Sequence, residues 1–337
     1  MNLNKILSVT LIFAFLSGLC SLAYAADDEL VVFSGRKDAF VKPVVRAFTK
    51  KTGIKVLLHT AKSTALLNKL RLEGEATQAD LFLSNDAGNL QLGSQMALFR
   101  PITSSIGDVI PEQYRAKDNH WLGLSARARV LVVNTELVKD EFDSIFDLAD
   151  PKWKGKIAIT NSTNESYIAG VTVYLKATDQ ARTKKWLEGI KANADDSVFG
   201  KHSHIVKAVA DGKKTVGLVN HYYIYRHLAK HPKAPIAIVM PDQGDDAMGV
   251  AWNVAGVAIS KYSKKHQLAE RFVKFLVSEE GQKMFAEANN EYPTRSGVPA
   301  AAVVPTVGSY KVTTVPMSEL GSYRNETIDL LEEVGMP

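Results

Sequence analysis

Cysteine is almost absent from this chain of 337 residues, whose single thiol is Cys20. Cys20 lies in an N-terminal stretch that we expect to be removed, so the exported chain is predicted to contain no cysteine. A protein without cysteine forms no disulfide bonds, no thiolate metal sites and no cysteine nucleophile. Oxygen and nitrogen atoms remain as ligands for a metal.

Long apolar runs are also missing. The apolar stretch of residues 6–16 is shorter than the ~20 residues that a transmembrane helix needs, and no later stretch is long enough. Lys5 before this stretch and Ala23-Tyr24-Ala25 after it are typical of a secretory signal peptide. We therefore expect residues 1–25 to be cleaved after Ala25 and the chain to be exported to the periplasm.

Motifs of common enzymes and of nucleic-acid-binding proteins are absent as well. The chain has neither a Gly-x-Ser-x-Gly nucleophile elbow nor a His-Glu-x-x-His zinc motif. The net charge of +5 suits an anionic ligand, but the basic residues are scattered, so no nucleic acid is expected as a partner. A secreted metal-dependent enzyme remains an alternative, because His202, His204 and His221 could bind zinc. Histidines at helix starts are, however, more often surface residues.

The order of the apolar segments predicts an α/β fold. A hydrophobic content of 46% is typical of globular proteins, and the length is sufficient for two domains. Strands are predicted over residues 30–33 and 54–58, with an amphipathic helix between them. Near the C-terminus, a strand over residues 253–259 precedes one helix over residues 268–284, and a last helix covers about residues 326–333. This alternation predicts mixed, mainly parallel sheets flanked by helices.

Polar side chains recur at the ends of the predicted strands. Ligands of α/β proteins gather at this edge of the sheet, so the recurrence predicts one shared cleft between two lobes. Hydroxyl, amide and guanidinium groups at such helix starts can hold an anion, although each cluster can also be an ordinary turn or helix cap. The clusters are Ser34 to Arg36, Asn85 with Asp86, Arg127, Ser162 to Ser166, and Asn220 to Tyr223.

The adjacent tyrosines Tyr222 and Tyr223 are the most specific feature. They follow an apolar run over residues 215–219, and Asn220 is predicted to cap the helix that begins there. The start of a helix favours negative charge. A phenol is neutral at physiological pH, but a hard, highly charged cation can deprotonate it. The pair is therefore predicted to supply phenolate ligands for ferric iron, and the alternative is a pair of half-buried aromatic rings that seals the cleft.

At these stretches the chain resembles periplasmic ferric-ion-binding proteins, the solute receptors of ABC-type iron importers. The sequence Asn-His-Tyr-Tyr at residues 220–223 is the most specific match, whereas the others also fit relatives that carry phosphonates or polyamines. The matching segments are residues 32–36, 79–82, 124–130, 150–155, 220–226, 254–257 and 291–295.

The resemblance implies a type II fold whose two lobes close on Fe(III), with Tyr222 and Tyr223 as ligands and carbonate or phosphate as a synergistic anion. This chain has Asn85, with Asp86 beside it, where some family members carry a glutamate ligand. Tyr167 lies close to the position of an additional tyrosine in others, so these three residues are further candidate ligands. The candidate anion-binding residues are Ser34, Arg36, Arg127, Thr163, Asn164, Ser166 and Asn220.

The resemblance also implies how the chain is divided. Residues 26–126 and about 252–305 would form one lobe, and about 127–251 with 306–337 the other. Two crossing strands would act as the hinge between them. The partner would be an inner-membrane ABC permease, and the chain would be a monomer. The same fold binding an organic anion such as a phosphonate is the alternative, and its complex would lack the visible colour of ferric tyrosinate.

Overall fold

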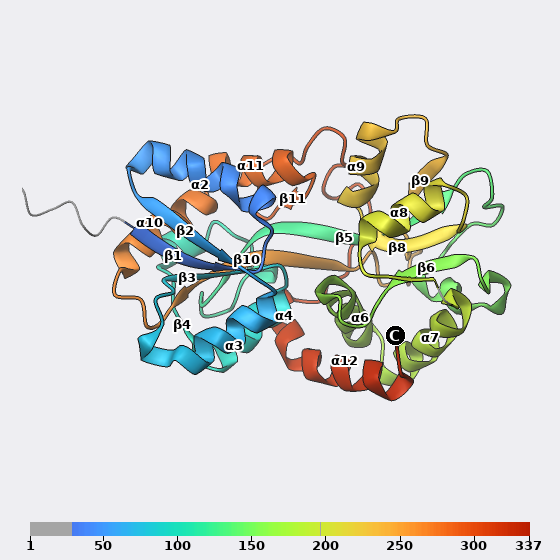
Figure 1. Cartoon of the computed structure of the whole chain (residues 1–337), viewed down its shortest axis with the longest axis horizontal. Helices are drawn as coiled ribbons and strands as arrows, with labels where there is room; N and C mark the ends of the chain where they lie inside the picture. The colour runs from blue at the N-terminus through green and yellow to red at the C-terminus, as the bar shows by residue number, and fades with distance from the viewer. Residues whose placement is uncertain (1–28, 196) are drawn as a thin grey trace, which may run out of the picture.

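The computed structural model describes residues 29–195 and 197–337. The predicted signal peptide and its cleavage site after Ala25 lie outside these residues. Within the described part, no helix combines the length and the apolar character that a membrane span requires. The chain forms two lobes of strands and helices that two long strands connect (Figure 1).

A mixed sheet of eleven strands runs through the described part of both lobes. Its main order is β2-β1-β3-β10-β5-β8-β6-β7, while β4 pairs with β10, and both β9 and β11 pair with β5. The strands are β1 Glu29–Ser34, β2 Lys55–Thr60, β3 Leu81–Ser84, β4 Phe99–Arg100, β5 Leu122–Asn134, β6 Ile157–Thr160, β7 Val198–Phe199, β8 Val216–Asn220, β9 Ile236–Val239, β10 Trp252–Ser260 and β11 Tyr292–Pro293.

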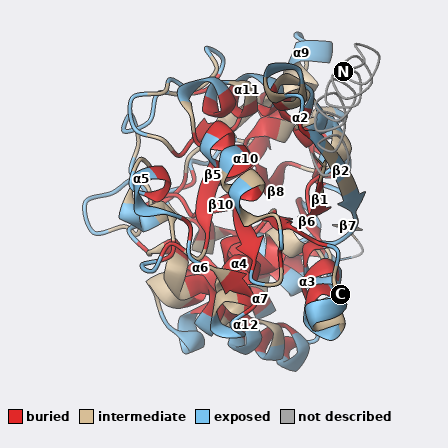
Figure 2. Ribbon diagram, turned by 90° about the vertical axis from the view of Figure 1, so that its left-hand side faces the viewer, coloured by how far each residue is buried: buried red, intermediate tan, exposed pale blue. Residues whose placement is uncertain are grey.

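Helices flank the sheet in both lobes, and the buried residues concentrate on the strands (Figure 2). The α-helices are α2 Asp38–Thr52, α3 Ser63–Glu73, α4 Ala87–Gln95, α5 Ser104–Gly107, α6 Glu165–Ala177, α7 Gln180–Ala194, α8 His202–Ala210, α9 Tyr222–Lys230, α10 His266–Leu276, α11 Glu279–Asn289 and α12 Leu320–Val334. The shorter 3₁₀ segments are η1 Gly74–Ala76, η2 Glu112–Tyr114, η3 Ile145–Ala149, η4 Pro151–Trp153 and η5 Met317–Glu319.

Strands β5 and β10 connect the two lobes. Among the described strands, every antiparallel pairing involves β5 or β10, and the remaining pairings are parallel. The prediction of mainly parallel pairing therefore holds outside these two strands. The first part of β5 pairs with β10 as far as Ala128, and its last part pairs with β8 from Arg129 onward. We call the side that contains β1–β3 the first lobe and the side that contains β6–β8 the second lobe.

Two predicted helices near the C-terminus have different bounds in the structure. Residues 268–284 do not form one helix, because α10 ends at Leu276 and α11 starts after Ser278. The hydroxyl of Ser278 accepts a hydrogen bond from the backbone N–H of Gly281 and so caps the new helix. The last helix, α12, begins at Leu320 rather than near residue 326, directly after η5.

A buried ion pair ties the loop after β1 to β5 and β11. Arg36 donates hydrogen bonds to Glu291 (Nη2 to Oε2, 2.6 Å) and to Ser125 (Nη1 to Oγ, 2.7 Å). Arg36 is 1% exposed and Glu291 is 2% exposed. Burial by itself would raise the pKa of Glu291, but Arg36, Arg127 and the hydrogen bonds from Arg36 and Ser125 outweigh burial and lower it. Glu291 therefore stabilises the fold as a carboxylate.

Replacement of Glu291 by Gln is expected to reduce the free energy of unfolding at neutral pH by about 3–5 kcal/mol, because it leaves Arg36 buried without a counter-charge. The folded-state pKa of Glu291 is lowered, so its contribution is present above the unfolded pKa of about 4.3 and is lost as the pH falls through the folded pKa. The difference between the two proteins should therefore shrink in acid. Urea unfolding followed by circular dichroism between neutral and acidic pH measures this difference.

Glu280→Gln is the matched control. Glu280 also forms an ion pair of 2.6 Å, with Lys51, but its side chain is 49% exposed, so the substitution should cost less than about 1 kcal/mol. Equal losses in the two variants, or a loss for Glu291→Gln that does not change with pH, would contradict the role assigned to the buried pair.

Candidate functional site

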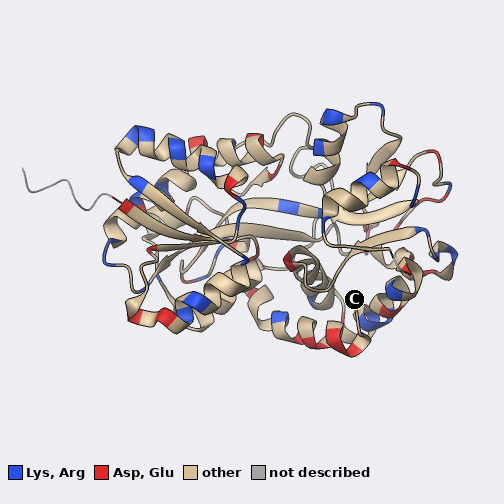
Figure 3. Cartoon of the chain, in the orientation of Figure 1, with Lys and Arg blue, Asp and Glu red and all other residues tan. Residues whose placement is uncertain are grey.

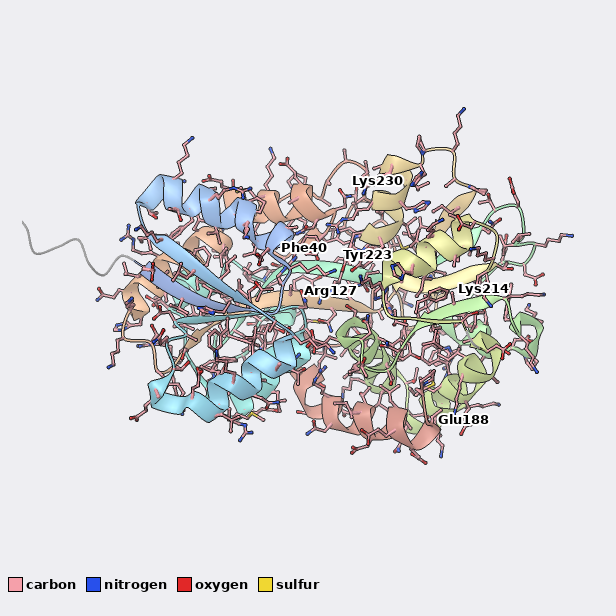
Figure 4. The ribbon with its side chains drawn as sticks, in the orientation of Figure 1. Phe40, Arg127, Glu188, Lys214, Tyr223 and Lys230 are labelled. Atoms are coloured by element: carbon pink, nitrogen blue, oxygen red, sulfur yellow. The ribbon has the colours of Figure 1, made fainter. Side chains whose placement is uncertain are left out.

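A cavity of about 460 Å³ lies between the two lobes and is the candidate binding cleft. The first lobe supplies residues at the starts of α2 and α3 and after β3, and the second lobe supplies the starts of α6, α8 and α9. Figure 4 places the labelled residues Phe40, Arg127 and Tyr223 together where the two lobes meet. The lining residues are Lys37, Lys62, Asn85, Asn161, Thr163, Asn164, Glu165, Ser166, Gly200, Lys201, His202, Ser203 and Tyr223.

The two adjacent tyrosines lie in the first turn of α9, as the sequence predicted. Strand β8 ends at Asn220, and α9 begins at Tyr222. The ring centroids of Tyr222 and Tyr223 are 4.5 Å apart. The prediction that Asn220 caps α9 is wrong, because His221 occupies the cap position and no side chain caps this helix. Instead, the Asn220 amide donates to the hydroxyl of Tyr222 (3.3 Å) and so fixes that phenol beside the strand end.

The environment of Tyr223 keeps its phenol protonated in the absence of a cation. Burial raises the pKa of Tyr223, and the neighbouring Tyr222 raises it further. The positive charges of Arg226 and Arg127 act in the opposite direction but do not compensate. A phenolate at this position therefore requires a strong positive charge close to its oxygen.

His202 and His221 are buried beside the tyrosines, which corrects the interpretation of these histidines as surface residues; only His204 of the three is exposed. The ring of His202 stacks on Tyr223 with centroids 5.0 Å apart. Burial, and then the charge of Arg129, hold the pKa of His202 well below its usual value. His202 shares one face of α8 with Ile205, Val206 and Val209, and this apolar periodicity is the sequence signal for its burial.

His221 joins the start of α9 to β5 and to Asn290 at the end of α11. Its Nδ1 accepts a hydrogen bond from the backbone N–H of Ala128 in β5 (3.1 Å), and its Nε2 lies 2.7 Å from the carbonyl oxygen of Asn290. Burial lowers the pKa of His221 to about 4, so the ring is neutral near pH 7. Among the described residues, no three His, Cys, Asp or Glu side chains are grouped so that they could hold a metal ion, and His202, His204 and His221 therefore do not form such a group.

Arg127 and Arg129 are both buried, and they lie on the same side of β5 as the alternation of the strand predicts. They line a small second cavity together with Ser166, Asn220 and Asn253. Arg129 donates to the ring of His202 (Nη1 to Nε2, 3.2 Å) and to Asn220 (3.3 Å). Its Nε and Nη2 atoms have no hydrogen-bond partner, and no described carboxylate forms an ion pair with it.

Three of the predicted anion-binding residues belong to the start of α6. Thr163, Asn164 and Ser166 all line the cleft. The side chain of Asn164 caps the helix by accepting hydrogen bonds from the backbone N–H groups of Ser166 and Tyr167 (3.0 and 3.2 Å). Ser166 lines both cavities, and its hydroxyl lies 3.5 Å from the Asn220 amide. The start of α6 therefore lies at the cleft, as the sequence predicts, and the side chain of Asn164 caps this helix.

Ser34 and Arg36, two of the candidate anion-binding residues, form most of their polar contacts within the fold. Ser34 is fully buried, and its hydroxyl forms hydrogen bonds only with the backbone of Arg36. The guanidinium of Arg36 is paired with Glu291 and Ser125. Neither residue lines either cavity of the cleft.

Asp86, a candidate ligand from the sequence, has several hydrogen-bond partners within the fold. Its carboxylate caps α4 by accepting from the backbone N–H groups of Gly88 and Asn89, and it pairs with Arg324 (2.8 Å) and accepts from Asn253 (3.0 Å). The role of helix cap, which the sequence also allows for this cluster, is therefore confirmed.

Asn85 and Tyr167, the other two candidate ligands, contact neighbouring residues of the fold. Asn85 lines the cleft, but its amide nitrogen donates to the carbonyl oxygen of Gly35. Tyr167 is 1% exposed and does not line the cleft; its ring lies 5.8 Å from the guanidinium carbon of Arg129. Tyr167 therefore contributes to the packing around Arg129 rather than to the cleft surface.

Comparisons with known proteins assign the chain to a family. Residues 44–309 match the family described as bacterial extracellular solute-binding protein. Iron uptake protein A1 of Synechocystis is 32% identical over 315 residues, which cover 91% of this chain and 87% of that protein. The Fe(3+)-binding periplasmic protein of Serratia marcescens is 30% identical over 319 residues, which cover 93% and 92%.

Solved structures show the same relationship. The Trichodesmium protein IdiA (FutA), in complex with iron and citrate ligands, has a TM-score of 0.82 at 32% identity, and the match covers 92% of this chain and all (100%) of that one. Iron-bound HitA from Pseudomonas aeruginosa has a TM-score of 0.85 at 26% identity and covers 91% and 99%. The chain therefore belongs to the bacterial extracellular solute-binding proteins, and it is a two-lobe binding protein of type II rather than an enzyme.

Proposed function

We propose that this protein binds Fe(III) in the cleft between its lobes, with Tyr222 and Tyr223 as phenolate ligands, and delivers it in the periplasm to an inner-membrane ABC permease. The observation that carries the proposal is the pair of phenols in the first turn of α9, 4.5 Å apart between ring centroids, with Tyr223 on the cleft surface. Relatives named for iron uptake and ferric iron binding support the choice of metal.

The chemistry of the donor atoms favours ferric iron. Fe(III) is a hard cation, and phenolate oxygen suits it better than imidazole or thioether ligands. Burial and the neighbouring phenol raise the pKa of Tyr223, so only a strongly polarising cation converts it to the phenolate form near pH 7. His202 stacks flat on Tyr223 rather than pointing its nitrogen atoms at the phenol oxygen, so it orients the ring and is not proposed as a ligand.

A small anion, carbonate or phosphate, would complete the coordination shell. Arg127, Ser166 and Asn220 face one small cavity next to the tyrosines, and Thr163 with Asn164 lies at the adjoining start of α6. Hydroxyl, amide and guanidinium donors of this kind bind oxyanions at helix starts. Ser34, Arg36, Asp86 and Tyr167 are left out of the proposed site, because their polar groups are engaged or turned away from the cleft.

Closure of the lobes would occur by rotation about β5 and β10. The proposed lobes are residues 26–126 with about 252–305, and about 127–251 with 306–337. The change of partner along β5, from β10 at Ala128 to β8 at Arg129, supports a boundary at this point. Two extended strands that cross between lobes can absorb a hinge rotation with small changes in each residue.

Replacement of both Tyr222 and Tyr223 by Phe is expected to abolish the visible charge-transfer band that ferric tyrosinate gives when the iron-free protein is titrated with ferric citrate. The loss of two hydroxyl groups removes the donors but keeps the rings, so the fold should be retained. Visible absorbance follows binding, and far-UV circular dichroism checks the fold.

Tyr225→Phe combined with Tyr323→Phe is the matched control, since both of these tyrosines lie outside the lining of the cleft and one is on α9 itself. The control should keep the wild-type band. An unchanged band in Tyr222→Phe/Tyr223→Phe would contradict the ligand assignment. A wild-type protein that stays colourless and instead binds a phosphonate would favour the organic-anion alternative.

Contacts across the cleft support closure around a ligand. Glu165 at the start of α6 accepts hydrogen bonds from the backbone N–H of Thr64 (3.0 Å) and from its hydroxyl (3.3 Å), so a carboxylate of the second lobe caps α3 of the first lobe. On another side of the cleft, Arg226 of α9 stacks over Phe40 of α2 (4.4 Å) and donates to Asn289 (3.2 Å).

Glu165→Ala is expected to weaken iron binding by roughly 3- to 30-fold, the range for loss of a helix cap, while the absorption maximum stays unchanged because the metal ligands are intact. Titration of the visible band gives both quantities. Glu188→Ala removes an exposed carboxylate on α7 of the same lobe, away from the cleft (Figure 4), and should have no effect. A shifted absorption maximum in Glu165→Ala would show that this carboxylate binds the metal, which would contradict its role in closure.

A further inference from the structure

The C-terminal end of α9 carries two histidines whose rings are in contact. His227 and His231 are four residues apart, and their ring centroids lie 4.7 Å apart with the ring planes tilted by 40°. Residues at this spacing on a helix are neighbours on its surface. Of the eight histidines in the sequence, only these two are separated by three or four positions. We call His227 and His231 the histidine pair.

The histidine pair lies apart from the candidate binding cleft. Neither residue lines either cavity of the cleft. Because a helix rises 1.5 Å per residue, His231 lies roughly 12 Å further along the axis of α9 than Tyr223. Figure 4 labels Lys230, the residue before His231, at the end of α9 opposite Tyr223. A ligand of the pair would therefore bind to the surface of the second lobe and not between the lobes.

The nitrogen atoms of the pair are not used by the fold. The histidine side chains that form hydrogen bonds or ion pairs within the described residues belong to His120, His202 and His221. His231 is exposed, and His227 is partly exposed. Burial, and then the charge of His231, lower the pKa of His227, so its ring is neutral near pH 7. Neutral imidazole is the form that binds a metal ion.

Few carboxylates lie near the histidine pair. Helix α9 contains no Asp or Glu, and Figure 3 shows basic residues in blue along it. Asp211 at the end of α8 is the acid whose charge acts on His227, and its carboxylate forms an ion pair with Lys207 (2.7 Å). In the part of the chain that the structure describes, no third His, Cys, Asp or Glu side chain joins the pair in a metal-binding group. The pair would therefore supply two protein ligands, and water would complete the coordination shell.

The type of ligand and its place on the helix select the class of metal. The last carbonyl groups of a helix have no partner within the helix, and this end of the helix dipole favours a cation. Two histidines at positions i and i+4 on one helical face are an arrangement by which helices bind zinc. Imidazole suits Zn(II), Cu(II) and Ni(II). Hard cations such as Mg(II) prefer carboxylate oxygens, which α9 lacks.

We propose that His227 and His231 form a further metal site, which binds one divalent ion of zinc, copper or nickel at the end of α9. This site differs from the cleft in its position, in its ligand atoms and in the class of metal that it takes. It does not depend on the proposed function, because neither Tyr222 nor Tyr223 takes part in it. The bound ion would link two residues one helical turn apart and so would stabilise the C-terminal end of the helix that presents the two tyrosines.

Isothermal titration of the purified, untagged, iron-free protein with zinc chloride tests the site. Wild type should bind one equivalent of zinc. Loss of an outer-shell partner of a metal ligand already costs about 10- to 100-fold in affinity, so His227→Gln/His231→Gln, which removes both ligands, should bind zinc at least about 100-fold more weakly. Nuclear magnetic resonance of wild type with isotope-labelled histidine gives a second readout that needs no change to the fold. Zinc should shift the ring signals of two of the eight histidines, and the single variants His227→Gln and His231→Gln assign them.

His204→Gln/His266→Gln is the matched control, since it removes two imidazoles from the starts of other helices, α8 and α10. This control and Tyr222→Phe/Tyr223→Phe should both bind zinc as wild type does. A wild-type protein that binds no zinc would overturn the inference, and so would undiminished binding in His227→Gln/His231→Gln. Loss of zinc binding in Tyr222→Phe/Tyr223→Phe would place the divalent ion in the cleft and would also overturn the inference.

Discussion

The turn from β8 to α9 is the constraint on which the rest of the site depends, because it presents two phenol groups from consecutive residues. Backbone geometry fixes both rings in the first helical turn, and the ring centroids lie 4.5 Å apart. Each neighbour of this turn then limits how the rings can move. Asn220 holds the hydroxyl of Tyr222, His202 stacks on Tyr223, and His221 joins the turn to β5. This one short segment therefore connects the proposed metal ligands to β5, the strand proposed as a hinge.

The buried guanidinium of Arg129 lies beside this turn without a carboxylate partner among the described residues, and it would help the site to tolerate the negative charge of the proposed ligands. Arg129 is buried and is not paired with a described acid; burial lowers its pKa, while nearby tyrosines act in the opposite direction. A buried cation of this kind is costly unless an anion or phenolate balances it. The iron-free protein thus carries an electrostatic cost close to the tyrosines, which ligand binding would relieve. Arg36 differs because Glu291 already neutralises it, so it stabilises the fold instead.

Local sequence patterns predicted the features that depend on neighbouring residues. The turn that carries the two tyrosines and the cap at Asp86 follow from apolar periodicity or from capping preferences, and the structure shows both at these positions. Partners far apart in the sequence were not predictable in this way. Arg36 and Glu291 are 255 residues apart in the sequence, and Asp86 and Arg324 are 238 residues apart. The sequence around Arg36 or Asp86 alone therefore does not show that these side chains have partners.

Two other predictions, the helix over residues 268–284 and the exposure of the histidines, were wrong because the same sequence pattern is compatible with two different local structures. Residues 268–284 keep a helical apolar periodicity through the break at Ser278, which only the local cap reveals. The histidines were interpreted from their position at helix starts, whereas the apolar face of α8 determines that His202 is buried.

Location of the iron in a crystal of the loaded protein tests the central assignment most directly. Anomalous diffraction at the iron absorption edge gives the metal position independently of the surrounding density. The account predicts one strong peak in the cleft, within coordination distance of both the Tyr222 and Tyr223 oxygens. A peak bound by other side chains, or a cleft that holds a metal-free organic anion with both phenols directed away from it, would contradict the account.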